Sequence, residues 1–221
     1  MTERLLTADR TIGHVARVVS AVFTPLLIPL LVFVILFLFS YLRIMPLEYK
    51  LIVLGVVCSF TLLLPLFSIY AFRRLNRLTQ QDLHDRQHRY APFVLTIVSY
   101  VLCLLMMRRM NIPWYMSGIV LTVLIVTVVC AVANLRWRVS EHTAGAGSVV
   151  GGVVAFSALF GYDPVGWLCL TILVAGVIGS ARLVLGRHTL GEVLWGFVVG
   201  FVCALGVLHP LANVLARILL L

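Results

Sequence analysis

Residues 114–135 read WYMSGIVLTVLIVTVVCAVANL, and this uninterrupted apolar run decides the fold class of the chain. It contains no charged side chain. A helix of about 20 predominantly apolar residues crosses the hydrocarbon core of a bilayer, so the run predicts a transmembrane helix. Its apolar residues are continuous rather than alternating, which argues against a strand of a membrane β-barrel.

The composition of the whole chain extends this prediction to its full length. Of the 221 residues, 62% are hydrophobic and only 11% are charged, too few to cover the surface of a soluble domain. No linker rich in Pro, Gly or Ser separates a second domain, so we expect one membrane domain over residues 1–221. The net charge of +9 is more typical of loops that set topology or meet anionic head groups than of a nucleic-acid partner.

Several apolar segments predict an all-α membrane bundle of six or seven transmembrane helices. They cover residues 17–41, 51–72, 92–107, 114–135, 143–161, 164–185 and 189–208. Pro25, Pro29 and Pro65 predict kinks or breaks because proline removes a backbone donor. The first segment is therefore either a seventh span or a re-entrant or interfacial piece. The pairs Gly147–Gly151 and Gly196–Gly200 have GxxxG spacing, which lets neighbouring helices approach closely.

Polar residues gather on one predicted face of the membrane. Counting crossings places the N-terminus and residues 73–91, 136–142 and 182–188 on that face, and the other connections on the opposite face. Each polar cluster immediately precedes a predicted helix. Helix N-termini present free N–H groups and a partial positive charge, so three of them brought together would form an anion site.

The sharpest motif is RLVLGRHTLGE at residues 182–192. His188 and Glu192 have i,i+4 spacing, which predicts that they share a helix face. A carboxylate that accepts from the imidazole Nδ1–H leaves Nε2 as a nucleophile or base. Gly186 can reverse the chain so that Arg182 returns to the same place. The alternative is an interfacial His with an exposed Glu, but an acidic side chain one turn into a membrane helix is costly.

The second motif is Ser140-Glu141-His142, which precedes a run of small residues. Ser140 is expected to cap the following helix, and a backbone N–H beyond it can face an anion. His142 supplies a second imidazole that can act as an acid. The alternative is a plain helix cap beside an interfacial His.

The third motif is DRQHRYAPF at residues 85–93. Arg86 and Arg89 are three residues apart, so they share a helix face, and both guanidinium groups can donate hydrogen bonds to one phosphate. Pro92 is expected in the first turn of the next helix. The alternative is a set of surface ion pairs, because Asp82–Arg86 and Asp85–Arg89 also have i,i+4 spacing.

These motifs resemble the three signatures of the type-2 phosphatidic acid phosphatase superfamily, membrane lipid phosphatases related to vanadium haloperoxidases. The signature Ser-Arg-x5-His-x3-Asp appears here with identical spacing, as Ala181-Arg182, His188 and Glu192. Pro-Ser-Gly-His appears as residues 139–142, which keep Ser and His. Lys-x6-Arg-Pro is kept least: Asp82 replaces Lys, and Arg89 is followed by Tyr. Arg86 is a candidate substitute for that Lys.

The resemblance implies a phosphatase that needs no metal and no cofactor and hydrolyses a phosphate or pyrophosphate monoester of a lipid. In it, His188 would be the nucleophile and form a phosphohistidine, and Glu192 would orient it. His142 would protonate the leaving oxygen and then activate water. The phosphate oxygens would be held by the remaining site residues, namely Arg182, Arg89, Arg86, Ser140 and the backbone N–H of Glu141.

Two alternative functions accompany this reading. One is a phosphotransferase that passes the phosphate to a lipid or sugar hydroxyl. The other is a non-catalytic lipid-binding or transport relative, which is supported by the replacement of the signature Lys by Asp82 and of the signature Asp by Glu192. The resemblance also implies a multi-pass protein of a bacterial inner membrane. The excess of basic residues on the N-terminal side predicts a site in the cytoplasm. Many bacterial members of the family face the periplasm instead, so the sequence allows both orientations.

Overall fold

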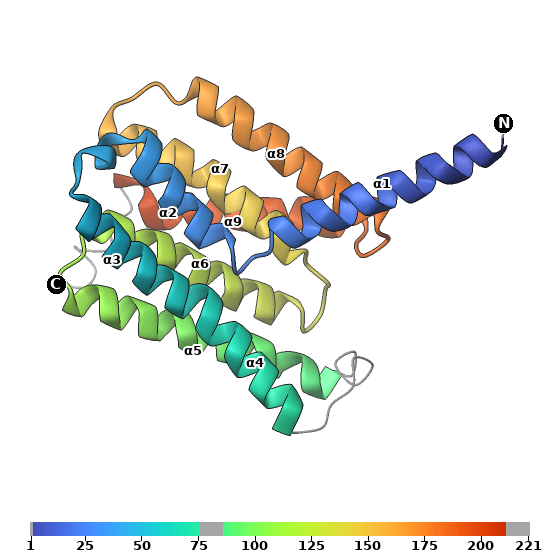
Figure 1. The fold of residues 1–221 in the computed structure, drawn as a ribbon, viewed down its shortest axis with the longest axis horizontal. Coiled ribbons are helices and arrows are strands. Elements are labelled where there is room, and N and C mark those ends of the chain that lie inside the picture. Colours follow the sequence, from blue (N-terminus) through green and yellow to red (C-terminus); the bar gives the residue numbers. More distant parts are fainter. Residues whose placement is uncertain (1, 76–85, 211–221) are drawn as a thin grey trace. The chain divides into compact units, whose positions relative to one another are not determined.

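The computed structural model describes residues 2–75 and 86–210, with side chains for these residues except 2–11, 41, 73, 75 and 86–91. Within these ranges the regular structure is helical and contains no strand, which confirms the all-α prediction. The elements in chain order (Figure 1) are α1 (Thr2–Val22), α2 (Ile28–Phe39), η1 (Tyr41–Ile44), α3 (Leu47–Val57), η2 (Cys58–Leu63), α4 (Leu64–Leu75), α5 (Arg86–Arg109), α6 (Trp114–Ala133), α7 (Glu141–Phe160), α8 (Val165–Val184) and α9 (Leu190–Leu208).

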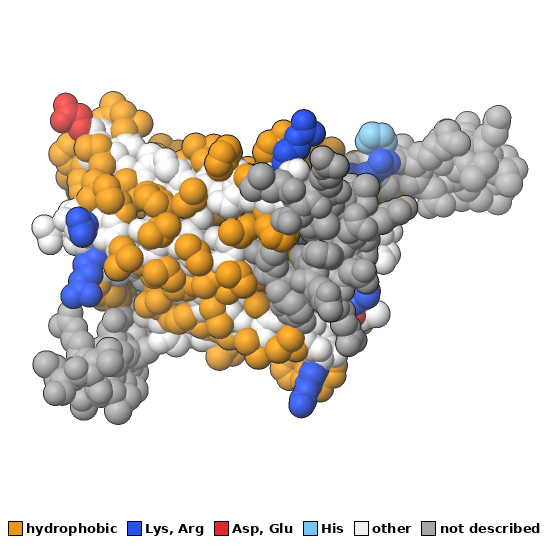
Figure 2. Space-filling model, turned by 90° about the horizontal axis from the view of Figure 1, so that it is seen from below, with side chains coloured by type: hydrophobic (Ala, Val, Ile, Leu, Met, Phe, Trp, Pro, Cys, Tyr) orange, Lys and Arg blue, Asp and Glu red, His pale blue; other side chains and the backbone are white. Residues whose placement is uncertain are grey.

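Six stretches among the described helices are long and apolar enough to cross a membrane. One is the continuous helix Leu47–Phe72, built from α3, η2 and most of α4. The others are Pro92–Arg109 within α5 and the whole of α6, α7, α8 and α9. Hydrophobic side chains cover most of the described surface that faces the viewer in Figure 2, as expected for helices in contact with lipid. The chain is therefore an integral, multi-pass membrane protein.

The first predicted segment, 17–41, is not one span. α1 ends at Val22 and α2 begins at Ile28, with Pro25 in the intervening turn. Pro29 lies in the first turn of α2, where a missing N–H breaks no helical bond. The apolar parts of both helices, Ile12–Val22 and Ile28–Phe39, are too short to cross a bilayer alone. The predicted break at Pro25 is confirmed, and the described helices contain six stretches long and apolar enough to be spans.

The third predicted helix starts earlier than the sequence suggested. α5 begins at Arg86, and Pro92 lies inside it rather than in its first turn, so the expected position of Pro92 is wrong. The apolar span nevertheless begins at Pro92, which leaves the preceding polar turn as a helical extension. Proline there removes one helical bond only, and the polar turn that loses it lies outside the apolar span. The side chains of Arg86 and Arg89, and the pairs with Asp82 and Asp85, lie outside the described residues.

The chain forms two compact units, Met1–Pro25 with Val132–Leu221, and Leu26–Ala131. We call the first the site unit, because it contains α1, α7, α8 and α9 and all the candidate site residues except Arg86 and Arg89. In the second unit, the helix that holds Pro65 contains the π-helical turn Cys58–Leu63, where a wider turn accommodates the missing proline donor. The expectation of a single domain over residues 1–221 stays a prediction.

In the site unit, α7 packs on both α8 and α9, and α1 packs on α8. The core under the site is formed by Ala146, Val150, Ala175 and Ile178, with Val19 and Phe23 of α1 packed against it. This arrangement brings the C-terminal end of α1 against α7 and α8.

Glycine allows the close contact between α7 and α9. A Cβ at Gly196 would lie 2.5 Å from both the carbonyl oxygen of Ser140 and Oγ1 of Thr143. Gly200 and Gly147 face the backbones of Ala144 and Phe197 in the same way. The predicted GxxxG contacts are therefore confirmed, and they hold the N-terminal ends of α7 and α9 side by side.

Candidate active site

The C-terminal end of α8 turns back at Gly186. Gly186 has a φ of +60°, a conformation that favours glycine. Its N–H donates to the Leu183 carbonyl at 2.9 Å, and the next N–H, of Arg187, donates to the Arg182 carbonyl at 3.2 Å. This pair of bonds is a Schellman motif. The predicted reversal at Gly186 is confirmed, and it sends the chain from Arg182 directly to His188.

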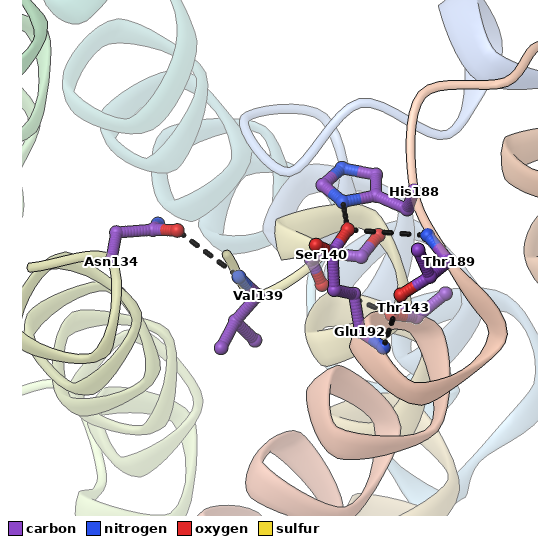
Figure 3. A network of polar contacts seen from close by, with 7 residues as sticks. All are labelled: Asn134, Val139, Ser140, Thr143, His188, Thr189 and Glu192. Carbon is purple, nitrogen blue, oxygen red and sulfur yellow. Dashed lines mark hydrogen bonds and ion pairs between the residues drawn. The ribbon is translucent and has the colours of Figure 1, made fainter. Parts of the chain in front are cut away.

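Glu192 holds His188 through the start of α9. His188 Nδ1 lies 2.9 Å from Glu192 Oε2, and the same oxygen accepts from the Thr189 N–H at 3.2 Å (Figure 3). Thr189 Oγ1 accepts in turn from the Glu192 N–H at 3.4 Å. Thr189 and Glu192 thus form a capping box, and one carboxylate oxygen serves both the helix cap and the imidazole.

The predicted pairing of His188 with Glu192 is confirmed, but its predicted geometry is wrong. Thr189 is the N-cap of α9 and has an extended backbone, so His188 precedes the helix and shares no helical face with Glu192. The two side chains meet because the capping box directs the glutamate back toward the start of the helix. The His188 and Glu192 side chains are 14% and 24% exposed, so the acidic group is largely enclosed and hydrogen-bonded.

The N-terminal end of α7 lies against this pair. The Ser140 N–H donates to the Glu192 carbonyl at 3.3 Å, and the Ser140 carbonyl accepts from Thr143 Oγ1 at 3.0 Å. Asn134 Oδ1 accepts from the Val139 N–H at 3.0 Å and holds the preceding loop (Figure 3). Ser140 is the N-cap residue, as predicted, but its side chain makes no capping bond.

Two buried polar atoms at this end have no hydrogen-bond partner among the described residues. They are Ser140 Oγ and Arg182 Nε, and Ser140 is fully buried. An unpaired buried donor costs free energy, and both atoms can donate to an oxygen. The oxygen atoms of a bound anion would supply the missing acceptors, as expected of a phosphate site.

His142 and Arg182 share a partner on α1, Ser20, that no sequence motif indicated. His142 Nε2 lies 3.2 Å from the Ser20 carbonyl oxygen, and Arg182 NH1 donates to Ser20 Oγ at 2.7 Å. His142 and His188 are near enough to influence each other electrostatically. The two predicted imidazoles and the predicted guanidinium are thus gathered at one end of the site unit.

Further charged groups surround this cluster. Arg187 and Glu141 lie within electrostatic range of Arg182, and Arg138 lies within range of His188. Burial lowers the pKa of His188 from its usual 6.5, and the guanidinium groups of Arg182 and Arg138 lower it further, whereas the bond to Glu192 opposes them. His188 is therefore held neutral over a wider pH range than a free imidazole.

The structure brings together six of the eight predicted residues: His188, His142, Glu192, Arg182, Ser140 and Glu141. The remaining two, Arg86 and Arg89, belong to the other unit and their side chains are not described. Sequence reasoning missed Ser20, Thr189 and Asn134. A Thr-x-x-Glu pattern at 189–192 is a capping-box signal and could have identified Thr189, whereas Ser20 carries no local signal at all.

The fold and the candidate site define a multi-pass helical membrane protein in which two imidazoles and a guanidinium are gathered at one end of the site unit. Residues 135–214 match the sequence model of the PAP2 superfamily, and this match supports membership of that superfamily. The match confirms the resemblance and includes the second and third motifs. Membership implies phosphatase-type activity on phosphate esters. None of the curated proteins and none of the solved structures matches the chain.

Proposed function

We propose that this protein is a membrane lipid phosphatase that acts through a phosphohistidine on His188. The observation that carries the proposal is the bond between His188 Nδ1 and Glu192 Oε2. A carboxylate only accepts, so Nδ1 carries the proton and the lone pair of the neutral ring lies on Nε2. A neutral, oriented imidazole beside guanidinium groups is the arrangement that nucleophilic attack on phosphorus requires.

In the first step, His188 Nε2 attacks the phosphorus and the bond from phosphorus to the lipid oxygen breaks. The leaving oxygen takes a proton from His142, and the products are a phosphohistidine and the lipid alcohol, or the lipid monophosphate when the substrate is a pyrophosphate. Arg182 and the N–H groups at the start of α7 stabilise the charge on the equatorial phosphate oxygens, because phosphoryl transfer depends mainly on positioning and charge stabilisation. The resemblance assigns Arg89 and Arg86 the same stabilising role, and this assignment stays a prediction.

In the second step, His142 accepts a proton from water, whose oxygen attacks the phosphorus. The nitrogen–phosphorus bond breaks, inorganic phosphate leaves, and His188 returns to its neutral form. Every proton in this cycle is carried by His142 and water. Independence from metal and cofactor stays part of the proposal.

A lipid substrate is supported by the surroundings of the site. Leu190, Leu194 and Trp195 in the first turns of α9 are 59%, 56% and 66% exposed, directly beside His188 and Glu192 in the chain. An apolar exposed surface next to an anion site at the end of a membrane span suits a phosphate that is attached to acyl or prenyl chains. Such substrates include phosphatidic acid, phosphatidylglycerophosphate, undecaprenyl pyrophosphate and lipid A, in a bacterial inner membrane.

The test is phosphate release by the purified protein from these lipids in detergent or nanodiscs, with and without acceptor alcohols. Release of inorganic phosphate without an acceptor supports the phosphatase. Phosphate transfer that occurs only with an acceptor would instead establish a phosphotransferase. If every lipid stays intact under both conditions while the protein binds lipid, the chain is a non-catalytic relative.

A further inference from the structure

Ser20 makes two contacts with the site although it lies on α1, far outside residues 135–214. Its carbonyl oxygen is bonded to His142 Nε2 at 3.2 Å, and its hydroxyl oxygen accepts from Arg182 NH1 at 2.7 Å. A single residue therefore contacts both the proposed acid and a proposed phosphate ligand. None of the three sequence motifs includes this residue.

The Ser20 carbonyl is available because it lies in the last turn of α1. α1 ends at Val22, and the last four carbonyl groups of a helix have no partner within it. The C-terminal end of a helix also carries a partial negative charge, which suits both an imidazole N–H and a guanidinium. The helix end thus offers the site an acceptor that can be neither protonated nor rotated away.

The position of Ser20 is fixed by packing on both sides. Val19 and Phe23 of α1 pack against the core of the site unit formed by α7 and α8, and the Phe23 N–H donates to the Val19 carbonyl at 3.0 Å. These contacts anchor the last turn of α1 immediately before and after Ser20. A donor bonded to Ser20 is therefore held in a defined place.

We propose that Ser20 is a positioning residue of the active site, which fixes the tautomer of His142 through its carbonyl and the guanidinium of Arg182 through its hydroxyl. This inference rests on the proposed function for its chemical meaning. A carbonyl only accepts, so His142 Nε2 keeps its proton, and Nδ1 is the atom that exchanges protons. In the first step Nδ1–H of the imidazolium passes its proton to the leaving oxygen, and in the second step neutral Nδ1 takes one from water.

The hydroxyl contact has a separate consequence. Arg182 NH1 is occupied by Ser20 Oγ, whereas Nε is buried without a partner among the described residues. The bond at NH1 orients the planar guanidinium so that its remaining donors form a fixed fork. Removing the hydroxyl should loosen this fork without removing the charge.

The first experiment compares Ser20→Ala and Ser20→Thr with the matched variant Ser180→Ala, which alters an exposed serine of α8. We measure vanadate affinity by calorimetry, together with kcat and KM for phosphate release. Ser20→Ala should weaken vanadate binding by about tenfold and raise KM more than it lowers kcat, and Ser20→Thr, which keeps a hydroxyl, should restore most of the affinity. The midpoint temperature of thermal unfolding should be the same in Ser20→Ala and Ser180→Ala. Vanadate affinity equal in Ser20→Ala and wild type would overturn the role of the hydroxyl.

The second experiment reads the tautomer without any turnover. In protein labelled with ¹⁵N-histidine, the ring resonances of His142 are assigned by comparison with His142→Gln. Neutral His142 should carry its proton on Nε2 in wild type and in Ser20→Ala, because the carbonyl belongs to the backbone. A proton on Nδ1 would overturn the role of the carbonyl. If the tautomer and vanadate results hold but no lipid releases phosphate, the positioning role stands and the proposed lipid phosphatase activity fails.

Discussion

Glu192 accepts a hydrogen bond from His188 Nδ1 at 2.9 Å with the same oxygen that caps the first turn of α9. The family signature has an aspartate at this position, and the longer glutamate is the residue type that closes a capping box three residues into a helix. Glutamate here therefore keeps contact with the imidazole and stabilises the helix start at once. The departure from the signature is compatible with an oriented nucleophile.

Glu192→Gln should slow the reaction more than it weakens substrate binding. The amide can still reach the Thr189 N–H, but it lacks the charge that supports the Nδ1–H tautomer. We expect kcat to fall by up to about 10⁴, the loss seen when the carboxylate behind a catalytic imidazole is neutralised, with KM changed little. Steady-state kinetics test this, with Glu48→Gln as the exposed control. A rise in KM at constant kcat would mean that Glu192 contacts substrate instead.

The pKa of His188 should lie below the usual 6.5, because burial and the nearby Arg182 and Arg138 disfavour the imidazolium. Its contribution to stability is therefore fully present above pH 6.5 and is lost as the pH falls toward the lowered pKa. Glu192 opposes the shift, so Glu192→Gln should lower the pKa further. An NMR titration of the ring measures this directly, which is preferable to a rate profile because phosphate esters themselves titrate near pH 6. A value at or above 6.5 in the wild type would contradict the described environment.

Gly196→Ala should push α7 away from α9 and disturb the site. The added Cβ would meet Ser140 O and Thr143 Oγ1 at 2.5 Å, and overpacking of this kind costs about 1–3 kcal/mol. Gly206→Ala on the same helix is the matched control, because nothing lies within 4 Å of its Cβ position. The midpoint temperature of thermal unfolding and the rate of phosphate release should both fall in Gly196→Ala and stay unchanged in Gly206→Ala. Equal stability of the two variants would show that the contact between the helices is looser than described.

The two ends of α8 should be labelled from opposite sides of the membrane. Arg187 lies beyond the C-terminal end of α8 beside the site, and Asp163 precedes its N-terminal end. Single cysteines at these exposed positions, in a background without other cysteines, should react with an impermeant maleimide from opposite faces. The face that reaches position 187 decides between a cytoplasmic and a periplasmic site. Labelling of both positions from one face would show that α8 does not cross the membrane.

Much of this site could be predicted because its residues are close in sequence or keep a signature spacing. Arg182, Gly186, His188 and Glu192 follow one another through a helix end, a turn and a helix start, and each step has a local signal. Helix boundaries near Pro25 followed from proline chemistry. The start of α5 did not, because a proline disfavours the interior of a helix without excluding it, and Pro92 lies inside α5.

The contact at Ser20 could not be predicted for a physical reason. Ser20 meets His142 and Arg182 across 122 and 162 residues of sequence, through a backbone carbonyl that every residue type possesses. Only the packing of Val19 and Phe23 on α7 and α8 brings it there. The shared helix face of His188 and Glu192 was wrong for a related reason, since spacing alone cannot tell a pair within a helix from a pair across its N-cap.

The most direct test of the central claim is the rate of phosphate release by His188→Ala, compared with wild type and with His14→Ala, which alters an exposed histidine of α1. The covalent route through Nε2 disappears with the imidazole, so turnover by His188→Ala should fall by about a thousandfold or more, while His14→Ala keeps the wild-type rate and both variants stay folded. Turnover by His188→Ala equal to that of His14→Ala would contradict the phosphohistidine mechanism.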